Sequence, residues 1–319
     1  MKMPKRFSLK PLFMIVCALF LFSCSENKQT VVQDDQTIRV VSTIKPLHFI
    51  ADALLKEVGE STWLIKSPDV HGYQLTPSDI KLINRSDMLI GIGEFFEGNV
   101  TELFTEKDFS FDDYQAKLAL LPLRDGLIWG DHDHVSHDEH DEHEIHAKHI
   151  DMHFWLSSKN ALLFAKALSE KLIQIFPQHA FKIEQNLEHF VQEINALEIS
   201  IKQRLAQSEP PSFMVFHDGF HYFTHQFGLE EQAAIVSDPS QQVGIKTLLE
   251  LKDLMVKTKV SCIFVEPGFN ESLTKTLLES VESESKVKVK ILYWDPIGMK
   301  AERYQDLIMG LFDGYLDCK

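Results

Sequence analysis

The chain has 319 residues, of which 44% are apolar and 25% are charged, and its formal net charge is −15. This length and composition suffice for two domains with hydrophobic cores and exclude a disordered or membrane-embedded protein. The negative charge argues against nucleic acid and anionic lipid as partners, whereas it suits metal cations.

The N-terminus has the pattern of an export signal. Basic residues precede an apolar run at 11–22 that is too short to span a bilayer. The run ends in Leu21-Phe22-Ser23-Cys24, which resembles the lipobox of bacterial lipoproteins and makes Cys24 the candidate lipidated residue. An ordinary cleaved signal with an incidental cysteine is the alternative. Both interpretations make residues 1–23 a signal peptide and residues 24–36 a flexible polar tether outside the cytoplasm.

Short β-rich segments alternate with helical patterns in both halves of the remaining chain, which predicts an α/β fold with parallel sheets. Helical patterns occupy, for example, 46–58 and 244–257. Each half also contains a helix, an apolar strand and a turn in that order, at 78–93 and 243–268, which indicates two similar lobes. The predicted strands lie at 38–44, 88–92 and 118–121 in the first half, and at 213–216, 233–236, 262–265 and 289–294 in the second.

A long helical region separates the two halves. Ser157 or Ser158 is the predicted N-cap of a first helix, and Pro177 begins a second one. Apolar residues recur at helical spacing over 183–205, which predicts that this second helix runs from Pro177 to Gln207 over roughly 45 Å. A coiled-coil oligomer would show the same stripe, but a helix packed across two lobes needs no partner chain. The expected organisation is an N-terminal lobe at 37–157, a helical region at 158–210 and a C-terminal lobe at 211–319.

Two cysteines remain beyond the export signal, Cys262 and Cys318. In a chain bound for an oxidising compartment, such a pair predicts a disulfide. The alternative is that Cys262, which lies within an apolar run, is a buried thiol.

The densest chemical signal is a segment rich in histidine and acid at 131–149, inside the predicted first lobe. Its histidines are His132, His134, His137, His140, His143, His146 and His149. Neutral imidazole is a good zinc ligand, and carboxylates add oxygen donors. Because the segment has almost no apolar residues, it predicts a mobile loop that binds several ions weakly. A merely solvated loop is the alternative.

The same segment lacks the pattern of a metallohydrolase. The zincin spacing HExxH begins at His143 and Glu144 but meets Ala147 where the second histidine belongs. Serine-hydrolase, P-loop and dinucleotide-binding motifs do not stand out, and no general base beside an open metal position is evident. The sequence therefore predicts a binding protein and not an enzyme.

Several segments, met in order along the chain, resemble the metal-binding solute-binding proteins of ABC transporters. The segment 71–79 (HGYQLTPSD) and the segment 152–157 (MHFWLS) each contain a histidine that ligates the metal in that family. The other matching segments are 40–47, 216–220, 265–269 and 294–298. The resemblance covers nearly all of the chain beyond the signal.

Within that family, the chain resembles the high-affinity zinc-uptake branch. The resemblance rests on the His-rich insert, on the placement of the cysteine pair, and on His217, where manganese-binding relatives usually carry a glutamate. Imidazole nitrogen suits zinc, whereas a site richer in carboxylate suits manganese.

The resemblance implies two α/β lobes joined by one long helix, with a metal site in the cleft between them. It assigns His71, His153 and His217 as zinc ligands, with Asp295 or water in the fourth position. Some zinc-binding relatives carry an acidic residue before the first histidine, and Val70 stands there in this chain. Without the family motifs, the spacing of His217, His221 and His225 would also allow a second, helix-borne metal site.

The expected function is capture of Zn²⁺ in the periplasm and its delivery to an ABC permease and its ATPase subunit. We expect a monomer that touches the membrane only through a lipid anchor, if Cys24 carries one. A manganese- or iron-binding protein of the same fold is the nearest alternative, an envelope adhesin or metal-storage protein the next, and a metallohydrolase the third.

Overall fold

The structure, a computed structural model, describes residues 37–68, 70, 73–93, 97–129, 150–239, 243–269, 271–286 and 288–319. The signal peptide, the tether with Cys24, His71 and the His-rich segment at 131–149 lie outside these residues. Within the described part, none of the helices is both long and apolar enough to cross a lipid bilayer.

The first half of the chain forms a three-stranded parallel sheet with the order β2-β1-β3. Its strands are β1 (Ile38–Ser42), β2 (Gly59–Trp63) and β3 (Met88–Ile90). Helix α2 (Lys45–Leu55) follows β1 directly, with Pro46 in its first turn, and buries an apolar face. Helix α3 (Pro77–Arg85) begins at a capping box between Thr76 and Asp79. Short helical turns complete this half: η2 (Gly98–Leu103), α5 (Phe111–Tyr114) and η3 (Gln115–Lys117).

The strand expected at 118–121 is wrong, because side chains replace the strand ladder there. The side chain of Asn160 accepts a hydrogen bond from the N–H of Ala119 and donates one to its carbonyl oxygen, at 2.8 and 3.0 Å. The N–H of Leu121 donates to the hydroxyl of Tyr222 at 2.9 Å. The carbonyl oxygen of Leu121 accepts from the N–H of Asp151 at 3.0 Å beside an isolated bridge, so these backbone groups are satisfied without a strand ladder.

The second half forms a four-stranded parallel sheet with the order β5-β4-β6-β7. Its strands are β4 (Phe213–His217), β5 (Glu231–Val236), β6 (Cys262–Val265) and β7 (Lys290–Tyr293), and its helices are α8 (His221–Phe227), α9 (Ile245–Thr258), α10 (Ser272–Ser285) and α11 (Tyr304–Asp317). The α/β class with parallel sheets is confirmed. The expected disulfide is also confirmed, since Cys262 on β6 is bonded to Cys318 just beyond α11.

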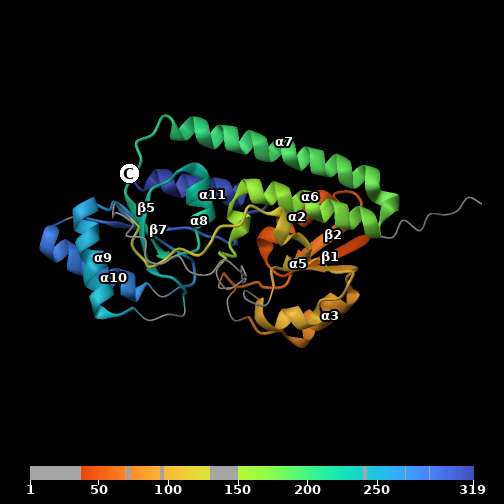
Figure 1. Cartoon of the computed structure of the whole chain (residues 1–319), viewed down its shortest axis with the longest axis horizontal. Coiled ribbons are helices and arrows are strands. Elements are labelled where there is room, and N and C mark those ends of the chain that lie inside the picture. Colours follow the sequence, from red (N-terminus) through yellow and green to blue (C-terminus); the bar gives the residue numbers. More distant parts are fainter. Residues whose placement is uncertain are drawn as a thin grey trace, which may run out of the picture. The chain divides into compact units, whose positions relative to one another are not determined.

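The helical region between the sheets contains η5 (Phe154–Leu156), α6 (Ser158–Ile175), η6 (Pro177–His179) and α7 (Ala180–Leu205). Ser157 caps α6 by accepting a hydrogen bond from the N–H of Asn160. With 26 residues, α7 is about 39 Å long. It packs against its neighbour α6, against α2 from the first half and against α11 from the second, so contacts within the chain bury its apolar face (Figure 1).

The two halves are also joined by main-chain pairing. Ile128 forms an antiparallel bridge with Ala233 of β5, and the N–H of Trp129 donates to the carbonyl of Gln232 at 3.0 Å. The end of the first half therefore lies against the second sheet, and residues 37–319 form one compact unit. The lobe bounds at 157 and 210 stay a prediction.

Candidate metal centre

Two of the histidines expected to bind metal lie side by side. His217 is the last residue of β4, and His153 immediately precedes η5. Their ring centroids are 5.2 Å apart, and the two residues are only 3% and 8% exposed. Since zinc holds imidazole nitrogens at about 2.0–2.1 Å, two rings at this separation can share one ion.

Gly219 permits this approach of the two rings. A Cβ atom at this position would lie 2.9 Å from Cε1 of His217 and 3.2 Å from Nε2 of His153. Any larger residue would therefore push against both imidazoles, so the loop after β4 keeps room for them.

Each of the two imidazoles is held by a buried carboxylate. Nδ1 of His153 lies 2.8 Å from Asp151, and Nδ1 of His217 lies 2.9 Å from Glu266. In protein metal sites, a ligating histidine usually gives its second ring nitrogen to a carboxylate in this way, which fixes the orientation of the ring. With Nδ1 engaged, Nε2 is the nitrogen that each ring can present to a metal.

Neighbouring groups shift the pKa values of His217 and Asp151. Burial has the largest influence on the pKa of His217 and lowers it, but Glu266, Asp218 and Asp151 together raise this pKa above its ordinary value. Burial has the largest influence on the pKa of Asp151 and raises it, but the hydrogen bonds and charge of His153, with the charge of His221, together leave this pKa below the ordinary value. The sequence interpretation gave neither Asp151 nor Glu266 a role, although Asp151 stands two residues before a candidate ligand and Glu266 lies in a family motif.

Asp295 is engaged in a tight turn. Its carboxylate accepts hydrogen bonds from the N–H groups of Ile297, Gly298 and Met299 at 3.1, 2.9 and 2.7 Å. In the part of the chain that the structure describes, which leaves out His71, no group of three or more His, Cys, Asp or Glu side chains is placed to hold a metal ion. The roles of His71 and Asp295 as ligands stay predictions.

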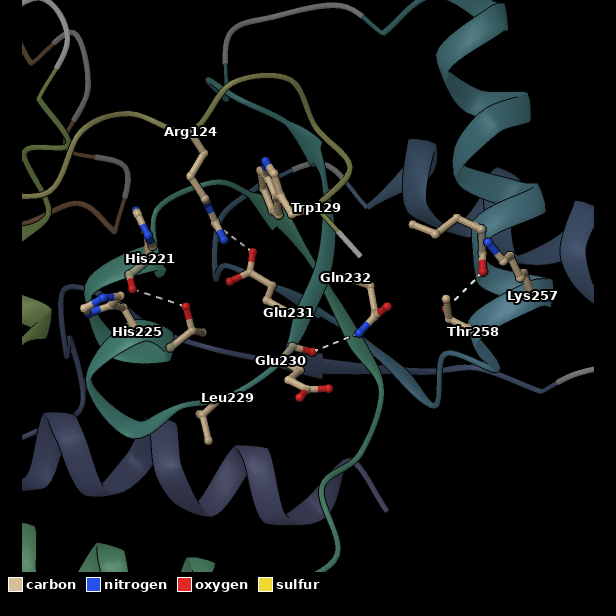
Figure 2. A pocket seen from close by; sticks show the side chains of 12 residues that line it. Arg124, Trp129, His221, His225, Leu229, Glu230, Glu231, Gln232, Lys257 and Thr258 are labelled. Atoms are coloured by element: carbon tan, nitrogen blue, oxygen red, sulfur yellow. Dashed lines mark hydrogen bonds and ion pairs between the residues drawn. The ribbon is translucent and has the colours of Figure 1, made fainter. Parts of the chain in front are cut away.

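A separate cavity of about 730 Å³ lies beside α8 (Figure 2). Arg124 reaches into it, donates hydrogen bonds to Asp218 and to Glu231, and lies 3.5 Å above the ring of Trp129. Burial raises the pKa of Glu231 to about 7, and the nearby charge of Arg124 only partly opposes this shift. Arg124 therefore compensates two buried carboxylates, one of which follows His217 directly.

His221 and His225 also line this cavity, with ring centroids 6.0 Å apart. His217 does not share their helix, because α8 begins at His221 and His217 ends β4. The three histidines with i, i+4 spacing therefore do not lie on one helical face.

Comparisons with known proteins show which family this chain resembles. The family model described as "Zinc-uptake complex component A periplasmic" (ZnuA) matches residues 40–315. The high-affinity zinc uptake system protein ZnuA of Haemophilus ducreyi is 30% identical over 295 residues, and the match covers 88% of this chain and 92% of the relative. The protein of the same name from Brucella abortus is 28% identical over 314 residues, with 88% and 91% covered.

Solved structures share the fold. The periplasmic zinc-binding protein TroA from Treponema pallidum superposes with a TM-score of 0.69 at 19% sequence identity, and the match covers 89% of this chain and 99% of TroA. Because the family model matches nearly all of the described residues, this chain belongs to the ZnuA family of periplasmic zinc-uptake components.

Proposed function

We propose that this protein captures Zn²⁺ outside the cytoplasm and delivers it to the permease of an ABC importer, whose ATPase subunit drives transport. The observation that carries the proposal is the buried pair His153 and His217, with each Nδ1 bonded to a carboxylate. Imidazole nitrogens favour zinc over manganese, and the names of the relatives describe zinc uptake. The protein acts as a binding component and not as an enzyme.

In this proposal, His71 from the first lobe joins the pair, and Asp295 or water completes a tetrahedral sphere. The His-rich segment at 131–149 gathers ions at low affinity and passes them to this site. The protein works as a monomer in the periplasm, and lipid attached to Cys24 would hold it at a membrane.

Metal analysis of a chain that lacks residues 131–149 tests the proposal. The shortened protein should bind one Zn²⁺ tightly, and His71→Ala, His153→Ala or His217→Ala should each abolish tight binding. His189→Ala is the matched control, because His189 lies on the exposed side of α7 and should leave binding unchanged. Loss of tight binding on removal of 131–149 alone would refute the division of labour between the loop and the buried site.

Competition between Zn²⁺ and Mn²⁺ on the same shortened protein tests the cargo. Zinc should displace manganese at equal concentrations. The reverse order would identify a manganese-binding protein of the same fold.

A further inference from the structure

Lys45 links the two halves of the molecule. It is the first residue of α2, yet it is only 7% exposed. Its ammonium group donates hydrogen bonds to the carbonyl oxygens of Met299 and Ala301, both at 2.8 Å. These acceptors lie 254 and 256 positions further along the chain, between β7 and α11. Lysine is almost never buried without such partners, so the two carbonyls account for its position.

The acceptors belong to the turn that Asp295 organises. The N–H of Met299 donates to the Asp295 carboxylate at 2.7 Å, while the carbonyl oxygen of the same residue accepts from Lys45 at 2.8 Å. Met299 therefore links Lys45 to Asp295 through two hydrogen bonds, one at its carbonyl oxygen and one at its N–H. The segment 295–301 is held internally by Asp295 and from across the molecule by Lys45.

Trp155 fixes the same turn next to the metal centre. Its Nε1 donates to the carbonyl of Pro296 at 2.8 Å, and its ring centroid lies 5.2 Å from that of His153. The hydroxyl of Tyr304, the first residue of α11, donates in turn to the carbonyl of Trp155 at 2.7 Å. Movement of the 295–301 turn would therefore reach the segment that carries His153.

Aromatic rings and carboxylates surround the ammonium group of Lys45 and favour its position against the 295–301 turn. Its Nζ lies 5.2 Å from the ring centroid of Phe49 and 5.1 Å from that of Trp63, which a second ammonium, that of Lys66, also covers. Burial lowers the pKa of Lys45, and Asp295 and Glu302 oppose this shift. Asp295 and Glu302 thus attract the ammonium group of Lys45, and the rings of Phe49 and Trp63 lie beside it.

We propose that Lys45 is a positioning residue that holds the 295–301 turn against the first half of the chain and thereby slows the release of zinc. The inference rests on the proposed function. Without the Lys45 bonds, the turn would lose its attachment to α2, and the site beside it would open more often. Partners outside the direct ligands commonly change metal affinity by about 10–100-fold.

The variant Lys45→Met tests this role, because methionine is apolar, similar in length and unable to donate either bond. Lys66→Met is the matched control, since Lys66 covers the same Trp63 ring. Lys45→Arg restores a charged donor at the original position. Amide hydrogen exchange at Ile297, Gly298 and Met299 is measured in the zinc-free proteins, and the rate of zinc release to excess chelator is measured in the loaded ones.

In Lys45→Met, both the exchange of the three amides and zinc release should become about 10-fold faster, whereas Lys66→Met should match the parent and Lys45→Arg should fall between. Equal behaviour of Lys45→Met and Lys66→Met would overturn the inference, and so would faster exchange without faster release. If Lys45→Met does not fold, as judged by circular dichroism, Lys45→Ala, which also cannot donate either bond, takes its place. A parent protein that binds no zinc would refute the proposed function, while the exchange measurement would still report whether Lys45 holds the turn.

Discussion

Glu266 fixes the orientation of His217 from the neighbouring strand end. The carboxylate follows β6, the imidazole ends β4, and these two strands are paired in parallel. Nδ1 of His217 lies 2.9 Å from Oε1 of Glu266, and both residues are at most 5% exposed. The carboxyl ends of adjacent parallel strands thus bring a ligand and its orienting partner together.

Glu266→Gln should weaken zinc binding by about 10-fold, because an amide can still accept a hydrogen bond but no longer makes the imidazole more basic. Competition with a chelator of known affinity measures the change. Glu284→Gln, which alters an exposed carboxylate paired with Lys252, should bind zinc as the parent does. Parent-like binding by Glu266→Gln would show that the carboxylate does not tune the site.

Arg124→Met should destabilise the zinc-free protein by about 3–5 kcal/mol, because it leaves the buried carboxylates of Asp218 and Glu231 without their cation. Urea unfolding measures the change. Arg204→Met is the control, since Arg204 pairs with Asp313 where both side chains are largely exposed, and it should cost less than about 1 kcal/mol. A similar cost for both variants would contradict the importance of the Arg124 cluster.

Glu97 should make the folded protein less stable as the pH rises. Burial raises its pKa to about 7 although Thr43 and the N–H groups of Ile92 and Gly93 donate to its carboxylate. Because the folded-state pKa exceeds the ordinary value of 4.5, the folded state holds a proton that the unfolded state has lost. The stability from this proton is complete below pH 4.5 and is lost as the pH rises through about 7.

The raised pKa of Glu97 changes the free energy of unfolding by up to about 3 kcal/mol across this pH range. Urea unfolding of the parent and of Glu97→Gln at pH 5 and pH 8 isolates it. The parent should lose more stability between these two values than the variant, and an equal loss would exclude Glu97 as the source.

Removal of the disulfide should lower the free energy of unfolding by about 4 kcal/mol, because the bond closes a loop between residues 56 positions apart. The double variant Cys262→Ala, Cys318→Ala and the parent in reductant should show the same lower urea midpoint. If the double variant is destabilised much less than the reduced parent, the loop-entropy argument does not describe this bond.

Local patterns identified several elements well. The strand expected at 262–265 agrees with β6, and Ser157 caps α6 as expected. By contrast, β2 was missed, because Gly59–Trp63 carries polar residues and forms an edge strand that pairs only with β1. The apolar run at 118–121 was given a strand because its sequence does not show that Asn160 and Tyr222 satisfy its backbone.

The candidate site shows the same division. The sequence by itself determined the α/β class and the cysteine pair and, through its motifs, predicted which histidines bind metal, because these features lie in short contiguous segments. Only the tertiary structure decided that Asp151 and Glu266 hold the two imidazoles and that Lys45 reaches the Asp295 turn. Such contacts join residues up to 256 positions apart, and their distances follow from how the two sheets and α7 pack, which no local pattern encodes.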